Sequence, residues 1–64
     1  MAEYQLDDIV WARLPAGEMK GRISKVLPNY AWSGETKYEV VGVRGYEFVT
    51  IVSERLMRID NEAQ

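Results

Sequence analysis

The sequence predicts a small all-β domain: a closed barrel of five short strands, with one 3₁₀ turn before the last strand. Short segments rich in β-branched and aromatic residues alternate with Pro, Gly, Asn and Ser, which is typical of strands joined by turns. No segment carries a sustained helical period. The 64 residues allow one domain, which we place at residues 6–60 between flexible ends at 1–5 and 61–64. Closure of the sheet removes unpaired edges that invite aggregation.

The first two strands are predicted at residues 8–14 and 21–27, with a hairpin loop over residues 15–20. Successive side chains of a strand point to opposite faces. One face of the first strand therefore carries Val10, Ala12 and Leu14, and the other carries Ile9, Trp11 and Arg13. The same alternation places Arg22 and Lys25 of the second strand on opposite faces.

The third and fourth strands are predicted at residues 37–43 and 47–52, after a longer loop over residues 28–36. Apolar residues fall on both faces of the third strand, as expected where a strand curls around a small barrel. The segment that follows is short and lacks a complete capping box, so we expect a 3₁₀ turn over residues 53–55 and a last strand over 56–59.

The predicted interior of this barrel is apolar and draws on every strand. Its expected members are Val10, Ala12, Ile23, Val40, Val49, Leu56 and Ile59. We also expect three aromatic residues to lie in the core or in its wall, because aromatic rings dominate burial in small domains. These are Trp11, Tyr38 and Phe48.

The composition excludes several classes of function. The chain has no Cys and no His, which excludes disulfides, zinc–thiolate sites and the hydrolases that rely on an internal His or Cys. It has neither a Gly-rich phosphate loop nor a carboxylate cluster suited to Mg²⁺ or Ca²⁺. What remains is a binding module, or an enzyme whose site is assembled from several copies. We expect no cofactor and no metal.

The charge balance favours a protein or peptide partner. Eight Lys and Arg stand against ten Asp and Glu, for a net charge of −2, whereas domains that bind duplex nucleic acid usually carry a basic surplus. No run of about 18 apolar residues is present, so no membrane contact is expected. The N-terminal residues lack the pattern of a secretory signal, which favours a cytoplasmic location.

Three motifs are typical of a known superfamily. An acidic pair precedes the first strand in Asp7-Asp8-Ile9-Val10-Trp11-Ala12, the second strand opens with Gly21-Arg22-Ile23, and the last reads Leu56-Met57-Arg58-Ile59. Together they resemble the SH3-like barrels. The Tudor and PWWP branches are nearest, because Val10-Trp11-Ala12-Arg13 is similar to their Val-Trp-Ala-Lys opening, although Met19-Lys20-Gly21 lacks the Trp-Pro of PWWP domains. The resemblance implies a five-stranded barrel and, for Tudor-like domains, an aromatic cage for a methylated ammonium group.

A second resemblance keeps one enzymatic alternative open. The segment Val49-Thr50-Ile51-Val52 precedes Leu56-Met57-Arg58-Ile59 in a register similar to the plasmid-borne, trimethoprim-insensitive dihydrofolate reductases. Those are SH3-like barrels that build one site from four chains. Thr50 and Val52 stand where that family has the Gln and Tyr that contact ligands, so we do not expect an enzyme, and reductase activity is a remote alternative. The shared register favours a homo-oligomer formed through this fourth strand.

Aromatic residues at loops are the main candidates for a protein-binding site. Two large rings lie in the longest loop, which can seldom bury both, and aromatic side chains are frequent hot spots of protein interfaces. The candidate set for a protein or peptide partner is Tyr30, Trp32, Tyr46 and Trp11.

The alternative is a nucleic-acid-binding barrel, in which basic side chains on the strands bind the phosphates of the nucleic acid and Trp11 stacks on a base. Its candidate residues are Arg13, Lys20, Arg22, Lys25 and Lys37. Acidic residues are interleaved with these cations and would repel phosphates, so this reading ranks behind the protein-binding one.

Overall fold

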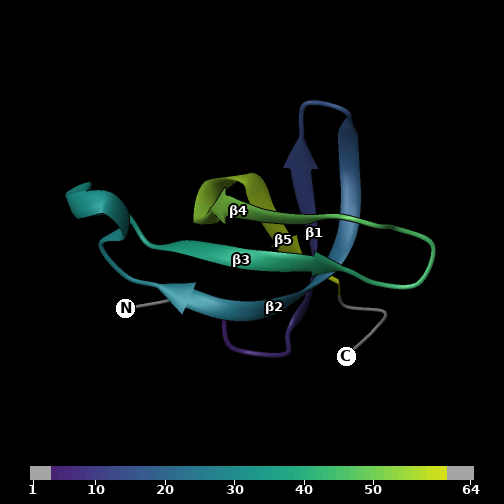
Figure 1. Ribbon diagram of the computed structural model, residues 1–64, viewed down its shortest axis with the longest axis horizontal. Helices are drawn as coiled ribbons and strands as arrows, with labels where there is room; N and C mark the ends of the chain where they lie inside the picture. Colours follow the sequence, from purple (N-terminus) through teal and green to yellow (C-terminus); the bar gives the residue numbers. More distant parts are fainter. Residues whose placement is uncertain (1–3, 61–64) are drawn as a thin grey trace.

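Five antiparallel strands form a single, strongly curled sheet in the order β4-β3-β2-β1-β5 (Figure 1). The computed structural model describes residues 4–60. Its strands are β1 (Ile9–Leu14), β2 (Gly17–Leu27), β3 (Lys37–Gly42), β4 (Val49–Ser53) and β5 (Met57–Ile59), with 3₁₀ helices η1 (Tyr30–Trp32) and η2 (Glu54–Leu56). The all-β class with five strands is therefore confirmed. No helix among residues 4–60 is long and apolar enough to cross a membrane.

The β1–β2 hairpin is tighter than predicted. Leu14 pairs with Gly17, so only Pro15 and Ala16 form the turn, and the predicted loop over residues 15–20 is wrong. Proline fixes φ near the value that a tight turn requires, and Gly17 adopts a φ of 125°, which other residues rarely adopt. The turn therefore closes within two residues, and the residues after it join the β2 ladder.

A bulge in β2 overturns the predicted placement of its cations. The register between β2 and β3 shifts between Ile23 and Lys25, so Arg22 pairs with Val41 and Lys25 pairs with Glu39. A bulge inserts one extra residue and bends its strand. Arg22 and Lys25 consequently lie on the same face of the sheet, the one turned away from the core, and both are exposed.

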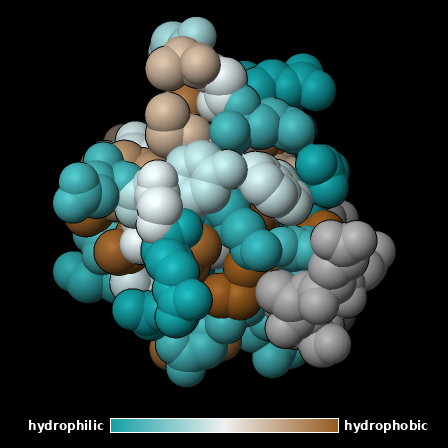
Figure 2. Space-filling model, turned by 90° about the vertical axis from the view of Figure 1, so that its right-hand side faces the viewer, coloured by the Kyte–Doolittle hydropathy of each residue, from teal (hydrophilic) through white to brown (hydrophobic). Residues whose placement is uncertain are grey.

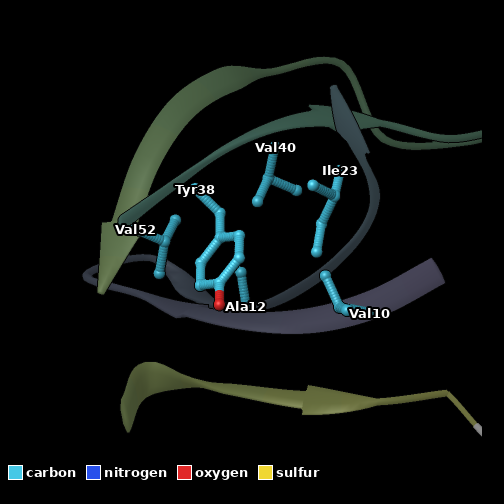
Figure 3. Packing of buried hydrophobic residues seen from close by; sticks show 6 residues of the cluster. All are labelled: Val10, Ala12, Ile23, Tyr38, Val40 and Val52. Atoms are coloured by element: carbon cyan, nitrogen blue, oxygen red, sulfur yellow. The ribbon is translucent and has the colours of Figure 1, made fainter. Parts of the chain in front are cut away.

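The core lies on the concave side of this curled sheet (Figure 3). Four predicted interior residues are fully buried there, and Tyr38 and Val52 join them; the buried set is Val10, Ala12, Ile23, Tyr38, Val40 and Val52. Fully burying a Val or Ile side chain stabilises the fold by roughly 1.5–3 kcal/mol. Among the other predicted members, Leu56 and Ile59 are partly buried and pack against this cluster.

Val49 is the predicted core residue that the structure places outside. Val40 pairs with Thr50, so Thr50 and Val52 share the inner face of the sheet with Val40, and Val49 points the other way. Val49 is 66% exposed. The prediction was wrong because apolar residues on both faces of β4 left its register open, and only the pairing with β3 decides it.

The closing segment is shifted by one residue from its prediction. The 3₁₀ turn spans Glu54–Leu56 instead of residues 53–55, and β5 follows at Met57–Ile59. A second 3₁₀ turn, η1, lies inside the long loop and was not predicted. Among the described residues β4 pairs only with β3 and β5 pairs only with β1. The sheet is therefore open, whereas a closed barrel was predicted.

The chain ahead of β1 also contributes to the packing. Tyr4 lies edge-on against Tyr38, with ring centroids 5.5 Å apart, and its hydroxyl donates a hydrogen bond to the Met57 carbonyl at 3.1 Å. Of the ends predicted to be flexible, residues 1–3 and 61–64 lie outside the described residues.

Candidate functional site

The loop between β2 and β3 presents the most exposed aromatic side chain. Trp32, at the end of η1, is 91% exposed. Its backbone is left-handed, with a φ of 63°, and Asn29 and Ala31 are left-handed too. This conformation is uncommon for non-glycine residues, and for a bulky one it is a genuine outlier with an energetic cost. The loop therefore exposes Trp32 through a backbone shape that other contacts must maintain.

Hydrogen bonds inside the loop provide those contacts. The Gly34 amide donates to Asn29 Oδ1 at 2.5 Å, and the Tyr30 amide donates to the Glu35 carbonyl at 2.9 Å. Ser33 Oγ donates to the Tyr30 carbonyl at 2.7 Å. These bonds connect residues on both sides of Trp32, so they hold the backbone that carries its side chain in one conformation.

Tyr30 lies beside Trp32 and is half-buried. The Lys37 ammonium lies 5.4 Å from the centre of the Tyr30 ring, within cation–π distance. A shallow groove runs along this part of the loop and is lined by Leu27, Pro28, Asn29, Tyr30, Ala31 and Trp32. We call this surface the Trp32 loop.

A second aromatic surface lies on the outer face of β1. Trp11 pairs with Lys20 on one side and with Arg58 on the other. The Lys20 ammonium lies 5.8 Å and the Arg58 guanidinium 5.5 Å from the Trp11 ring. The Tyr46 ring meets Trp11 edge-on with centroids 6.1 Å apart. We call these four residues the Trp11 surface.

Arg58 is the member of the Trp11 surface that the sequence analysis missed. Its signal is its position in the middle of the three-residue strand β5, directly opposite Trp11. That position becomes informative only once β5 is known to pair with β1, because the two strands are far apart in sequence.

Ion pairs neutralise most cations around Trp11. Lys20 Nζ lies 2.7 Å from an oxygen of Asp60, whose side chain is 6% exposed. Arg58 pairs with Glu18 at 3.3 Å, and on the same outer face Arg22 pairs with Asp7 at 3.1 Å. Figure 2, seen from the side of the β3–β4 loop, shows a mainly hydrophilic surface with hydrophobic residues in small separate areas. The charges of Lys20, Arg22 and Arg58 are thus balanced by close ion pairs.

The structure divides the predicted aromatic set into two. Tyr30 and Trp32 belong to η1, at the left of Figure 1, whereas Tyr46 follows β3 in the loop at the right. Trp11 contacts Tyr46 and not the Trp32 loop. The four rings therefore do not form one cage.

The predicted basic set is also divided. Arg13, Lys20 and Arg22 lie on the outer face of the β1–β2 hairpin, Lys25 lies past the bulge, and Lys37 lies over Tyr30. Within residues 4–60, Arg13, Lys25 and Lys37 form no ion pair.

The residues that align with the reductase ligand contacts are placed differently from one another. Val52 is buried in the core at 3% exposure and so lines no surface, while Thr50 is half-buried at the edge strand. In the part of the chain that the structure describes, no group of three or more Asp and Glu side chains is arranged to hold a metal ion.

Comparison with protein-family models, with curated proteins and with solved structures finds no match to this chain.

Proposed function

We propose that this chain is a non-catalytic interaction module that binds a protein segment at the Trp32 loop. The observation that carries the proposal is Trp32, which is 91% exposed on a loop braced by its own hydrogen bonds. A large apolar ring held in water gains free energy when a partner covers it. Because the loop is already ordered, binding costs little further conformational entropy.

We also propose that the sheet belongs to the SH3-like class, nearest to Tudor-like barrels. Support comes from the strand order β4-β3-β2-β1-β5, in which the last strand returns to the first, and from η2 directly before β5. The motifs around Trp11 and Gly21 point the same way. A fold does not by itself indicate which ligand is bound, so the binding proposal rests on the Trp32 loop alone.

The test compares the wild-type chain with Trp32→Ala. Immobilised protein is incubated with cell lysate, and retained partners are identified and quantified by mass spectrometry. We expect Trp32→Ala to lose the specific partners, because removing an interface hot spot costs about 2 kcal/mol or more, a loss of roughly thirtyfold in affinity. Leu6→Ala is the matched control, since Leu6 is also apolar and 59% exposed but lies outside the loop.

A purified partner then allows a direct optical test. The Trp11→Phe variant leaves Trp32 as the sole tryptophan, because the chain has two. Burial of Trp32 by the partner shifts its emission to shorter wavelength. An unchanged set of partners with Trp32→Ala, or an unchanged emission spectrum at saturation, rejects the loop as the site.

The second candidate is nucleic-acid binding at the Trp11 surface. The observation in its favour is that Arg13, Lys20 and Arg22 share the outer face with Trp11, and the bulge adds Lys25 to that face. Against it stand the ion pairs of Lys20 and Arg22, which a phosphate would have to displace. Binding of single strands would weaken with salt by a log–log slope near −0.7 per phosphate.

Fluorescence decides this candidate. In the Trp32→Phe variant, Trp11 is the sole reporter, and stacking on a base would quench its emission. No quenching and no gel shift at low salt, where electrostatic attraction is strongest, excludes nucleic acid as the ligand.

A further inference from the structure

The edge strand β4 exposes apolar side chains on its outer face. Val49 is 66% exposed and Ile51 is 41% exposed, although both belong to a regular strand. The strand reads Val-Thr-Ile-Val-Ser, with no charge, no Pro and no Gly. Natural edge strands are usually protected by charges, prolines or bulges. Within residues 4–60, β4 pairs with β3 alone.

The same two residues direct their backbone groups to the open edge. The Gly42 amide donates to the Phe48 carbonyl at 2.8 Å, which makes these two residues a hydrogen-bonded pair. Such pairs alternate along an antiparallel ladder, so Thr50 is bonded to Val40, and Val49 and Ile51 are not bonded to β3. The N–H and C=O groups of Val49 and Ile51 therefore point away from β3.

We propose that β4 pairs with β4 of a second copy of this chain, antiparallel, about a two-fold axis at Thr50. This register places Val49 opposite Ile51 of the second copy, and Ile51 opposite Val49. Both are hydrogen-bonded pairs, and their side chains meet on the outer face as β-branched cross-strand pairs. Thr50 faces its own copy across the axis in a non-hydrogen-bonded pair. The strand is thus complementary to itself in both hydrogen bonding and apolar contact.

Charge does not oppose the pairing. Glu39 is the acidic residue next to Ile51 on β3. With strands about 4.8 Å apart and an offset of two residues along the strand, the two copies of Glu39 lie roughly 16 Å from each other, beyond the screening length of about 8 Å in physiological salt. Lys25 is the backbone partner of Glu39 in the β2–β3 ladder, so one positive charge lies on the same face as Glu39 in each copy. The self-association is independent of the proposed function, because the Trp32 loop takes no part in it.

The oligomeric state of the full chain tests the proposal. Sedimentation velocity from micromolar to millimolar concentration is expected to show a monomer–dimer equilibrium. Ile51→Lys places a charge in the centre of the interface and should raise the dissociation constant about tenfold or more. Val49→Pro removes an outward N–H without breaking a bond to β3, so it should have the same effect. Leu6→Lys is the control with an exposed apolar residue elsewhere, and it should dimerise as the wild type does.

A single introduced thiol tests the register. The chain has no Cys, so Thr50→Cys carries the only thiol, and the axis brings two Thr50 Cβ atoms to about 4.5–5.5 Å. That separation permits a disulfide after modest adjustment, so mild oxidation should give a covalent dimer. Ala16→Cys, at the exposed hairpin turn, should not cross-link at the same rate. A wild-type chain that stays monomeric at millimolar concentration, a dimer that survives Ile51→Lys in folded protein, or equal cross-linking of the two Cys variants overturns the proposal.

Discussion

The two tryptophans of this chain occupy opposite kinds of surface. Trp11 lies on a strand, half-buried between Lys20, Arg58 and Tyr46. Trp32 lies on a loop, 91% exposed, on a left-handed backbone. Polar and aromatic neighbours contact the ring of Trp11, whereas the ring of Trp32 is exposed to solvent. The difference teaches that an aromatic residue indicates binding by its environment and not by its type.

The largest expected effect removes both surfaces at once. Val40 is fully buried at the centre of the core, on the strand between β2 and β4. Val40→Asp buries a carboxylate without a cation to pair it, at a cost of several kcal/mol against a total stability of about 5 kcal/mol for a domain this small. We expect an unfolded chain by circular dichroism, with neither partner capture nor the emission of a half-buried Trp11. A cooperative unfolding transition in this variant would contradict the described core.

The next largest effect is a difference in folding stability between variants of the two tryptophans. Trp11→Ala removes ring contacts with Lys20, Arg58 and Tyr46, and we expect it to lower the free energy of unfolding by about 2 kcal/mol, less than for a fully buried ring. Urea denaturation followed by circular dichroism measures this change. Trp32→Ala serves as its control and should change stability little. Equal losses in the two variants would show that the two environments do not differ energetically.

The smallest effect has the opposite sign. Trp32 holds a φ of 63°, a conformation that costs an L-residue roughly 1–2 kcal/mol and glycine almost nothing. Glycine loses more entropy on folding, so Trp32→Gly should stabilise the fold by a net of about 0.5 kcal/mol while it abolishes partner binding. The midpoint of urea unfolding measures the gain. A loss of stability in Trp32→Gly would indicate that the ring contributes packing in the free protein.

The sequence predicted the all-β class and most strand positions because alternation and turn residues are local signals. It placed Val10, Ala12, Ile23 and Val40 in the core. It failed for Val49, because a strand that is apolar on both faces reads equally well in two registers, and only its pairing with β3 decides between them. Local patterns also could not reveal the bulge that moves Lys25 to the face of Arg22.

The sequence could predict individual residues of the candidate sites, but not which of them lie together in space. The exposure of Trp32 follows from its place in a long loop, as expected. The separation of Trp11 and Tyr46 from Tyr30 and Trp32 depends on which ends of the sheet the loops occupy, and that is set by strand order. Arg58 was missed because β5 meets β1 from a distant part of the sequence.

The return of β5 to β1 also shapes the folding kinetics. The pairs β1–β2, β2–β3 and β3–β4 join strands that follow one another in the chain, while the pairing of Val10 with Ile59 closes a loop of almost the whole domain. If β5 paired before the other strands, the length-dependent entropy cost of closing about 50 residues would be roughly 3.5 kcal/mol, set against only three residues of ladder. We therefore expect β5 to form last during folding and to open first from the native state. Its amides should exchange with solvent deuterium faster than those of β3, through openings that leave the rest of the sheet intact.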